Sequence, residues 1–80
     1  MVYHCTTPKK LARYRTTGYI LPPVRYFTVE YAARRWMRRT GRTVLVTFDE
    51  PSRSWPLPDH GPAKWTDQPV AAFVAINEGE

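Results

Sequence analysis

Residues 29–48, VEYAARRWMRRTGRTVLVTF, combine the patterns of a helix and of a strand. The first half of this stretch places small and apolar side chains three or four positions apart, which predicts one buried stripe of a helix with arginines on the other side. Thr28 is the expected N-cap, and Gly41 is placed to end the helix. Residues 43–48 are β-branched and mostly apolar, which is typical of a strand covered on both faces. The stripe comprises Val29, Ala32, Ala33, Trp36, Met37 and Thr40.

The N-terminal segment repeats this combination of strand and helix in the opposite order. Residues 2–5 are good strand formers. Thr7 followed by proline predicts an N-cap and a first helical position, and Gly18 suits a left-handed helix end, so a short basic helix is expected over 8–17.

The remaining segments are short because eight prolines interrupt the chain. Residues 24–27 predict a short strand, and 52–68 an ordered loop pinned by Trp55 and Trp65. Residues 69–76 favour a strand, although their alanines leave a helix open, and 77–80 form an acidic tail. We therefore expect one domain over residues 1–80, of α+β class, with about four to five short strands and two helices.

Charge is divided unevenly along the sequence. Residues 1–43 hold ten basic residues and one acid, a net charge of +9, whereas residues 44–80 carry −4, for a total of +5. The basic half would attract an anionic partner such as a nucleotide, DNA, RNA or an acidic protein surface. The alternative is that the arginines only keep the protein in solution.

Cys5 is the single cysteine, so no internal disulfide forms, and no Cys/His spacing fits a structural metal site. No apolar run is long enough for a signal peptide or a membrane span. These features predict a cytoplasmic protein without a membrane partner, either a monomer or, through an open strand edge, a homodimer. Its small size and charge pattern would suit a phage or mobile-element protein.

Two short motifs resemble the ADP-ribosyltransferase-like fold, which is shared by NAD-using toxins and RNA 2'-phosphotransferases. The first is Tyr-His-Cys-Thr-Thr at residues 3–7, followed by a basic helix and Gly-Tyr-Ile at 18–20. The second is Tyr-Phe-Thr at 26–28, followed by a helix that begins Glu-Tyr-Ala-Ala. The resemblance covers most of residues 2–48.

This resemblance implies that NAD is a cofactor, with His4 on its ribose, Tyr26 stacked on its nicotinamide and Thr6 as a hydrogen-bond donor. The family's glycine after the histidine is Cys5 here, and residues 69–76 lack the family's catalytic glutamate. Catalytic residues therefore stay unknown, and the implied activity is nucleotide binding with doubtful transfer. The alternative interpretations are a strand histidine bonded to a backbone carbonyl and a core tyrosine.

The basic helices suggest a second kind of site, because a face of arginines and lysines can neutralise phosphates of nucleic acid. A rival function is that of a small adaptor or inhibitor that binds a protein through the basic helix or the Trp-bearing loop. His60 could lie over a pocket, but a solvated turn is the simpler interpretation. The predicted nucleic-acid-binding residues are Lys9, Lys10, Arg13, Arg34, Arg35, Arg38, Arg39 and Arg42.

Overall fold

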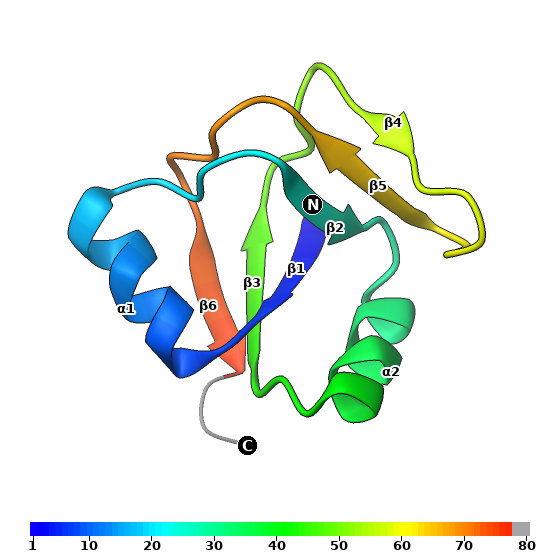
Figure 1. Ribbon diagram of the computed structural model, residues 1–80, viewed down its shortest axis with the longest axis horizontal. Coiled ribbons are helices and arrows are strands. Elements are labelled where there is room, and N and C mark those ends of the chain that lie inside the picture. Colours follow the sequence, from blue (N-terminus) through cyan, green and yellow to red (C-terminus); the bar gives the residue numbers. More distant parts are fainter. Residues whose placement is uncertain (78–80) are drawn as a thin grey trace.

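A computed structural model describes residues 1–77 and shows an antiparallel sheet with two helices (Figure 1). The α+β class is confirmed, but the sheet has six strands rather than four to five. In chain order the elements are β1 (Val2–Thr6), α1 (Pro8–Thr17), β2 (Val24–Phe27), α2 (Glu30–Thr40), β3 (Val44–Phe48), β4 (Trp55–Pro56), β5 (Ala63–Thr66) and β6 (Val74–Asn77).

The sheet has the strand order β4-β5-β2-β1-β3-β6, and every neighbouring pair is antiparallel. β1 pairs with β3 at every one of its residues, and β2 pairs with β5 in the same complete way. Between β1 and β2, however, only Tyr3 and Phe27 form a pair. The sheet therefore consists of two three-stranded halves, and we call the narrow junction between β1 and β2 the seam.

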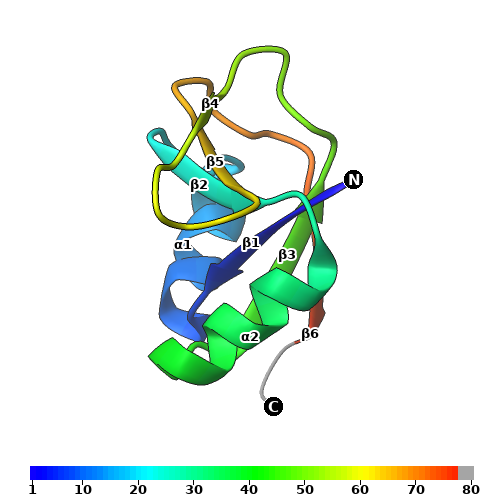
Figure 2. The same cartoon turned by 90° about the vertical axis from the view of Figure 1, so that its right-hand side faces the viewer.

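The two helices cover opposite faces of the sheet (Figures 1 and 2). Leu11 of α1 packs into a cluster with Val24, Val44 and Val46, whereas Ala33 and Met37 of α2 pack on Leu45. Successive strand residues point to opposite faces, so this division follows from the alternation of side chains along β2 and β3. All five residues of β3 are buried, as expected for a strand covered on both faces.

The ends of the helices follow local sequence signals, with one exception. Thr7 Oγ1 accepts a hydrogen bond from the backbone N–H of Lys10 at 3.2 Å, and Gly18 and Gly41 end α1 and α2 with φ of 82° and 74°. The prediction of Thr28 as the cap of α2 was wrong. The N-cap is Val29, whose side chain makes no cap hydrogen bond. The Thr28 hydroxyl donates instead to the carbonyl of Pro62, at 3.2 Å.

The extra strands lie within the segment expected to be a loop. β4 and β5 form a hairpin there, in which Trp55 lies opposite Trp65 and the rings stack with centroids 4.7 Å apart. Pro56 is tolerated because β4 is an edge strand, where a proline need not donate to a neighbour. The two tryptophans thus hold this segment in order as a strand pair.

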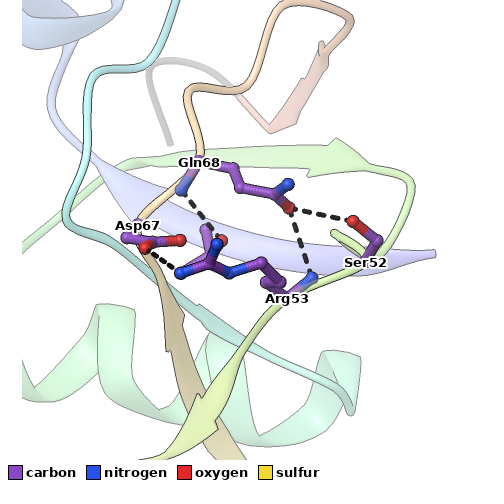
Figure 3. Close-up of polar contacts among 5 residues, drawn as sticks. Ser52, Arg53, Asp67 and Gln68 are labelled. Atoms are coloured by element: carbon purple, nitrogen blue, oxygen red, sulfur yellow. Dashed lines mark hydrogen bonds and ion pairs between the residues drawn. The ribbon is translucent and has the colours of Figure 1, made fainter.

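A polar clamp closes the open end of the hairpin (Figure 3). The Oε1 atom of Gln68 accepts bonds from the Ser52 hydroxyl at 3.3 Å and the Arg53 backbone N–H at 3.2 Å. The Arg53 guanidinium also pairs with Asp67 at 2.7 Å. The chain before β4 is thereby attached to the chain after β5.

The C-terminal apolar segment supplies β6, which pairs with β3, while Val70 bridges to Ile20. A strand rather than a helix therefore occupies the end of residues 69–76. The acidic tail assigned to 77–80 lies, from residue 78 onward, outside the described residues. Within residues 1–77, neither helix has the length and apolar character needed to cross a membrane.

Candidate functional site

A cavity of about 390 Å³ opens at the seam. This volume is in the range of sites that hold small ligands. Its wall is built from β1, α1, β2, α2 with the Arg42 that follows it, and the β4–β5 hairpin, so both halves of the sheet contribute to it. Its polar and aromatic lining includes His4, Lys10, Tyr14, Arg25, Trp36, Arg42 and His60.

His4 closes the seam where the two strands stop pairing. Its Nδ1 atom lies 2.6 Å from the carbonyl oxygen of Arg25, and because a carbonyl only accepts, Nδ1 carries the proton. Nε2 of the neutral ring then accepts a bond from the Tyr14 hydroxyl at 3.2 Å. The histidine is thus bonded to a backbone carbonyl, and its ring joins β1, β2 and α1.

The tyrosine extends this network, since the Thr6 hydroxyl lies 3.5 Å from the Tyr14 hydroxyl. Burial lowers the pKa of His4 below its usual 6.5, and the nearby charges of Lys10 and Arg42 lower it further, against the opposing effect of the Arg25 carbonyl. The neutral imidazole that the hydrogen bonds require is therefore also the form that the surroundings favour.

Among residues 1–77, three lysine and arginine side chains line the cavity, Lys10, Arg25 and Arg42, and no carboxylate does. The ion pairs among residues 1–77 join Arg34 to Glu30, Arg53 to Asp67 and Lys64 to Glu50, so none of them neutralises a cation of the cavity. A hollow with positive charges and no internal counter-charge attracts anions.

Among the described residues, four tyrosine, phenylalanine and tryptophan side chains line the cavity, namely Tyr14, Tyr26, Phe27 and Trp36. Tyr14 is half-buried beside His4, with ring centroids 5.9 Å apart. The Trp36 and His60 rings lie edge-on to each other with centroids 5.7 Å apart. The Arg39 guanidinium lies 5.9 Å from the centroid of the Trp36 ring. His60 therefore does lie at a pocket, where it contacts Trp36.

Tyr26 borders the same cavity as His4, but its ring lies in the core. The residue is 1% exposed, its ring packs edge-on against Phe48 with centroids 5.7 Å apart, and its hydroxyl donates to Glu50 at 3.4 Å. Burial is the main reason that the pKa of Tyr26 is raised. In this arrangement Tyr14 and Trp36, rather than Tyr26, have rings available to a ligand.

Cys5 faces the cavity as a thiol rather than a thiolate. Its Sγ atom donates to the carbonyl of Ala33 at 3.1 Å, and burial raises its pKa to about 11. A thiol that is protonated at neutral pH is a poor nucleophile. The cysteine therefore serves packing between β1 and α2.

The predicted phosphate-binding residues separate into two groups. Lys10 and Arg42 line the cavity, whereas the other six do not. Since α1 and α2 cover opposite faces, the two basic helices do not lie side by side. The six residues outside the cavity lining are Lys9 and Arg13 on α1 and Arg34, Arg35, Arg38 and Arg39 on α2.

Sequence reasoning missed Arg25, Tyr14 and Trp36 as parts of the site. Tyr14 and Trp36 each lie on the apolar side of a helix, so both had the pattern of core residues. The side chain of Arg25 points to the opposite sheet face from those of Val24 and Tyr26, which is the ordinary pattern of a strand. A cavity beside Arg25 could have been predicted only from knowing which strands pair with β2.

Comparisons with protein-family models, with curated proteins and with solved structures give no match for this chain. Within residues 1–77, no three His, Cys, Asp or Glu side chains are grouped so that they could hold a metal ion.

Proposed function

We propose that this protein binds a phosphate-bearing nucleotide in the cavity at the seam, as a small domain similar to ADP-ribosyltransferases. NAD or ADP-ribose is the ligand class that the resemblance of the first 48 residues suggests. The observation that carries the proposal is the group formed by Lys10, Arg25 and Arg42, three cations without an ion pair among residues 1–77 that line one ligand-sized cavity.

Each class of side chain in the cavity suits one part of such a ligand. The arginines can bind a diphosphate through paired N–H donors, and the ammonium of Lys10 adds a point charge. A base or nicotinamide ring can stack on Trp36 or Tyr14. A ribose hydroxyl can replace the Tyr14 hydroxyl at Nε2 of His4, because that bond, at 3.2 Å, is the longer of the two that the ring makes.

The proposal is for binding, and group transfer is not part of it. In the transferases that the two motifs resemble, a glutamate polarises the ribose, and among the described residues no carboxylate lines this cavity. Without that acid the cavity can still hold the ligand through charge and stacking.

A second candidate function rests on the outer side of α2. Tyr31, 68% exposed, and the exposed Arg35 and Arg38 follow one another at helical spacing, and tyrosine and arginine are common anchors of protein interfaces. This stripe favours an adaptor that binds an acidic protein surface. Since these three residues do not line the cavity, the two candidates can be tested separately.

Isothermal titration calorimetry tests the nucleotide proposal. NAD, ADP-ribose and ADP should bind, and adenosine, which has no phosphate, should bind at least about tenfold more weakly, equivalent to ~1.4 kcal/mol. Arg42→Gln should weaken ADP-ribose binding by about the same factor. Arg13→Gln is the matched control, because it removes the same charge from an exposed site outside the cavity. Equal effects of the two variants, or no heat at millimolar ADP-ribose, would contradict the proposal.

A further inference from the structure

The tryptophan hairpin shares a sheet face with the cavity. Arg25 of β2 lies opposite Trp65 of β5, which in turn lies opposite Trp55 of β4. Directly opposite residues of neighbouring antiparallel strands point to the same face. Trp55, Trp65 and Arg25 therefore form one row across three strands, which we call the tryptophan row. Its last member, Arg25, also lines the cavity, so the row leads into it.

The row is ordered by contacts within the hairpin. The Trp55 and Trp65 rings stack with their planes 29° apart, and the Arg53 guanidinium lies 5.5 Å from the centroid of Trp55. Figure 3 shows how Arg53 itself is held, by its pair with Asp67 and by the bond from its backbone to Gln68. A surface that is fixed before binding loses little entropy when a ligand arrives.

The tryptophan stack lies outside the buried core clusters of the protein. Trp55 is 38% exposed on a strand of two residues, and Trp65 is only half-buried. The row thus leaves part of each tryptophan open to solvent, with the Arg53 guanidinium over the Trp55 ring and Arg25 at the end beside the cavity. Because Asp67 already pairs with Arg53, the charge left along the row and in the cavity is that of Arg25, Lys10 and Arg42.

We infer that the ligand of this site is a single-stranded nucleic acid, whose bases stack on the tryptophan row while an adjoining nucleotide enters the cavity. The inference rests on the proposed function, since the cavity must accept a nucleotide. Aromatic rings on a sheet surface beside phosphate-binding cations are the combination by which proteins hold single strands without reading their sequence. The bases of duplex DNA already stack on one another, so the tryptophan rings would not strengthen the binding of a duplex.

Two quantities follow from the geometry. The three cations of the cavity can neutralise about three phosphates, so the logarithm of the binding constant should fall with the logarithm of salt with a slope of about −2. Stacking on the row should make an oligonucleotide bind about tenfold or more tightly than a mononucleotide.

The experiment measures fluorescence anisotropy of a labelled ribo-octamer and calorimetry of ADP-ribose on the same variants. Trp55→Ala should weaken octamer binding about tenfold and leave ADP-ribose binding within twofold, because Trp55 does not line the cavity. Trp55→Phe, which keeps a ring, should restore most of the octamer affinity. Tyr19→Ala is the matched control, since it removes an aromatic ring that is 47% exposed and lies outside both the row and the cavity.

The outcomes separate this inference from the function on which it rests. If ADP-ribose binds but the octamer binds no more tightly, the inference is wrong and the proposed function stands. The same conclusion follows if Trp55→Ala lowers the midpoint of thermal unfolding but leaves octamer binding unchanged. Should Trp55→Ala fail to fold, Trp55→Leu keeps an apolar contact with Trp65 without a ring, and unchanged octamer binding by it would overturn the inference. If neither ligand binds and poly-glutamate does, both proposals are wrong.

Discussion

The Nδ1 atom of His4 lies 2.6 Å from the backbone oxygen of Arg25, so a side chain of β1 makes the contact with β2 that the backbone does not. This single bond connects the two halves of the sheet beside the Tyr3–Phe27 pair. His4 and Arg25 also both line the cavity at the seam.

Replacement of His4 by alanine should destabilise the protein by about 1–3 kcal/mol, because the Arg25 carbonyl and the Tyr14 hydroxyl both lose a partner. His4→Asn should cost less, since the asparagine amide places a donor at the position of Nδ1. Urea unfolding followed by tryptophan fluorescence measures both. A loss below about 0.5 kcal/mol for His4→Ala would show that the bond across the seam is unimportant.

Stability should fall on acidification below pH 6.5. The unfolded chain takes up a proton on His4 near its usual pKa of 6.5, whereas burial lowers this pKa in the folded protein. Between the folded and the unfolded pKa of His4, the unfolded state binds more protons than the folded state, so the free energy of unfolding rises with pH in this range. The His4→Asn variant lacks this contribution. Unfolding free energies at several pH values between 5 and 7.5 should give a steeper rise for the natural protein, and parallel curves would contradict the assignment.

Cys5 should resist alkylation while the protein is folded. Its pKa of about 11 leaves almost no thiolate at pH 8, and its Sγ atom is bonded to the Ala33 carbonyl. Iodoacetamide should modify it at least about tenfold faster in denaturing urea than in buffer, as followed by mass spectrometry. Fast modification of the folded protein would mean that the thiol is an activated nucleophile.

Gly41→Ala should cost about 1 kcal/mol, because the residue ends α2 with φ of 74°, where a Cβ is unfavourable. Among the described residues, leaving aside those next to Gly41 in the chain, no atom lies within 4 Å of the position of that Cβ, so the cost comes from the backbone conformation rather than from crowding by packed side chains. Gly41→Asn should cost less, since asparagine tolerates this conformation. Thermal unfolding measures the stability of the two variants. Equal losses of stability would mean that the left-handed backbone conformation of residue 41 is not the cause.

Local signals in the sequence were sufficient for the helices. Thr7, Pro8 and Gly18 set the limits of α1, and the apolar stripe with Gly41 set the end of α2. These signals act between residues three or four positions apart, so they do not depend on contacts with distant parts of the chain. Thr28 was the exception, because the carbonyl of Pro62, distant in sequence, was a better partner for its hydroxyl.

The hairpin and the cavity depended on contacts between distant residues. The prolines of residues 52–68 suggested a loop, and only the pairing of Trp55 with Trp65 reveals two strands there. In the same way His4, Lys10 and Arg42 were expected in a site, but their meeting with Arg25 depends on the strand order and on the seam. Tyr26 lines the cavity as well, although its ring packs in the core.

A titration of ¹⁵N-labelled protein with ADP-ribose, followed by two-dimensional NMR, tests directly whether the cavity at the seam binds a nucleotide. If it does, shifts should concentrate at residues around the cavity, including His4, Arg25 and Arg42, and the imidazole signals of His4 should move with the same affinity. Shifts confined to the outer side of α2 around Tyr31 and Arg35, or no shifts at millimolar ligand, would contradict a nucleotide site at the seam.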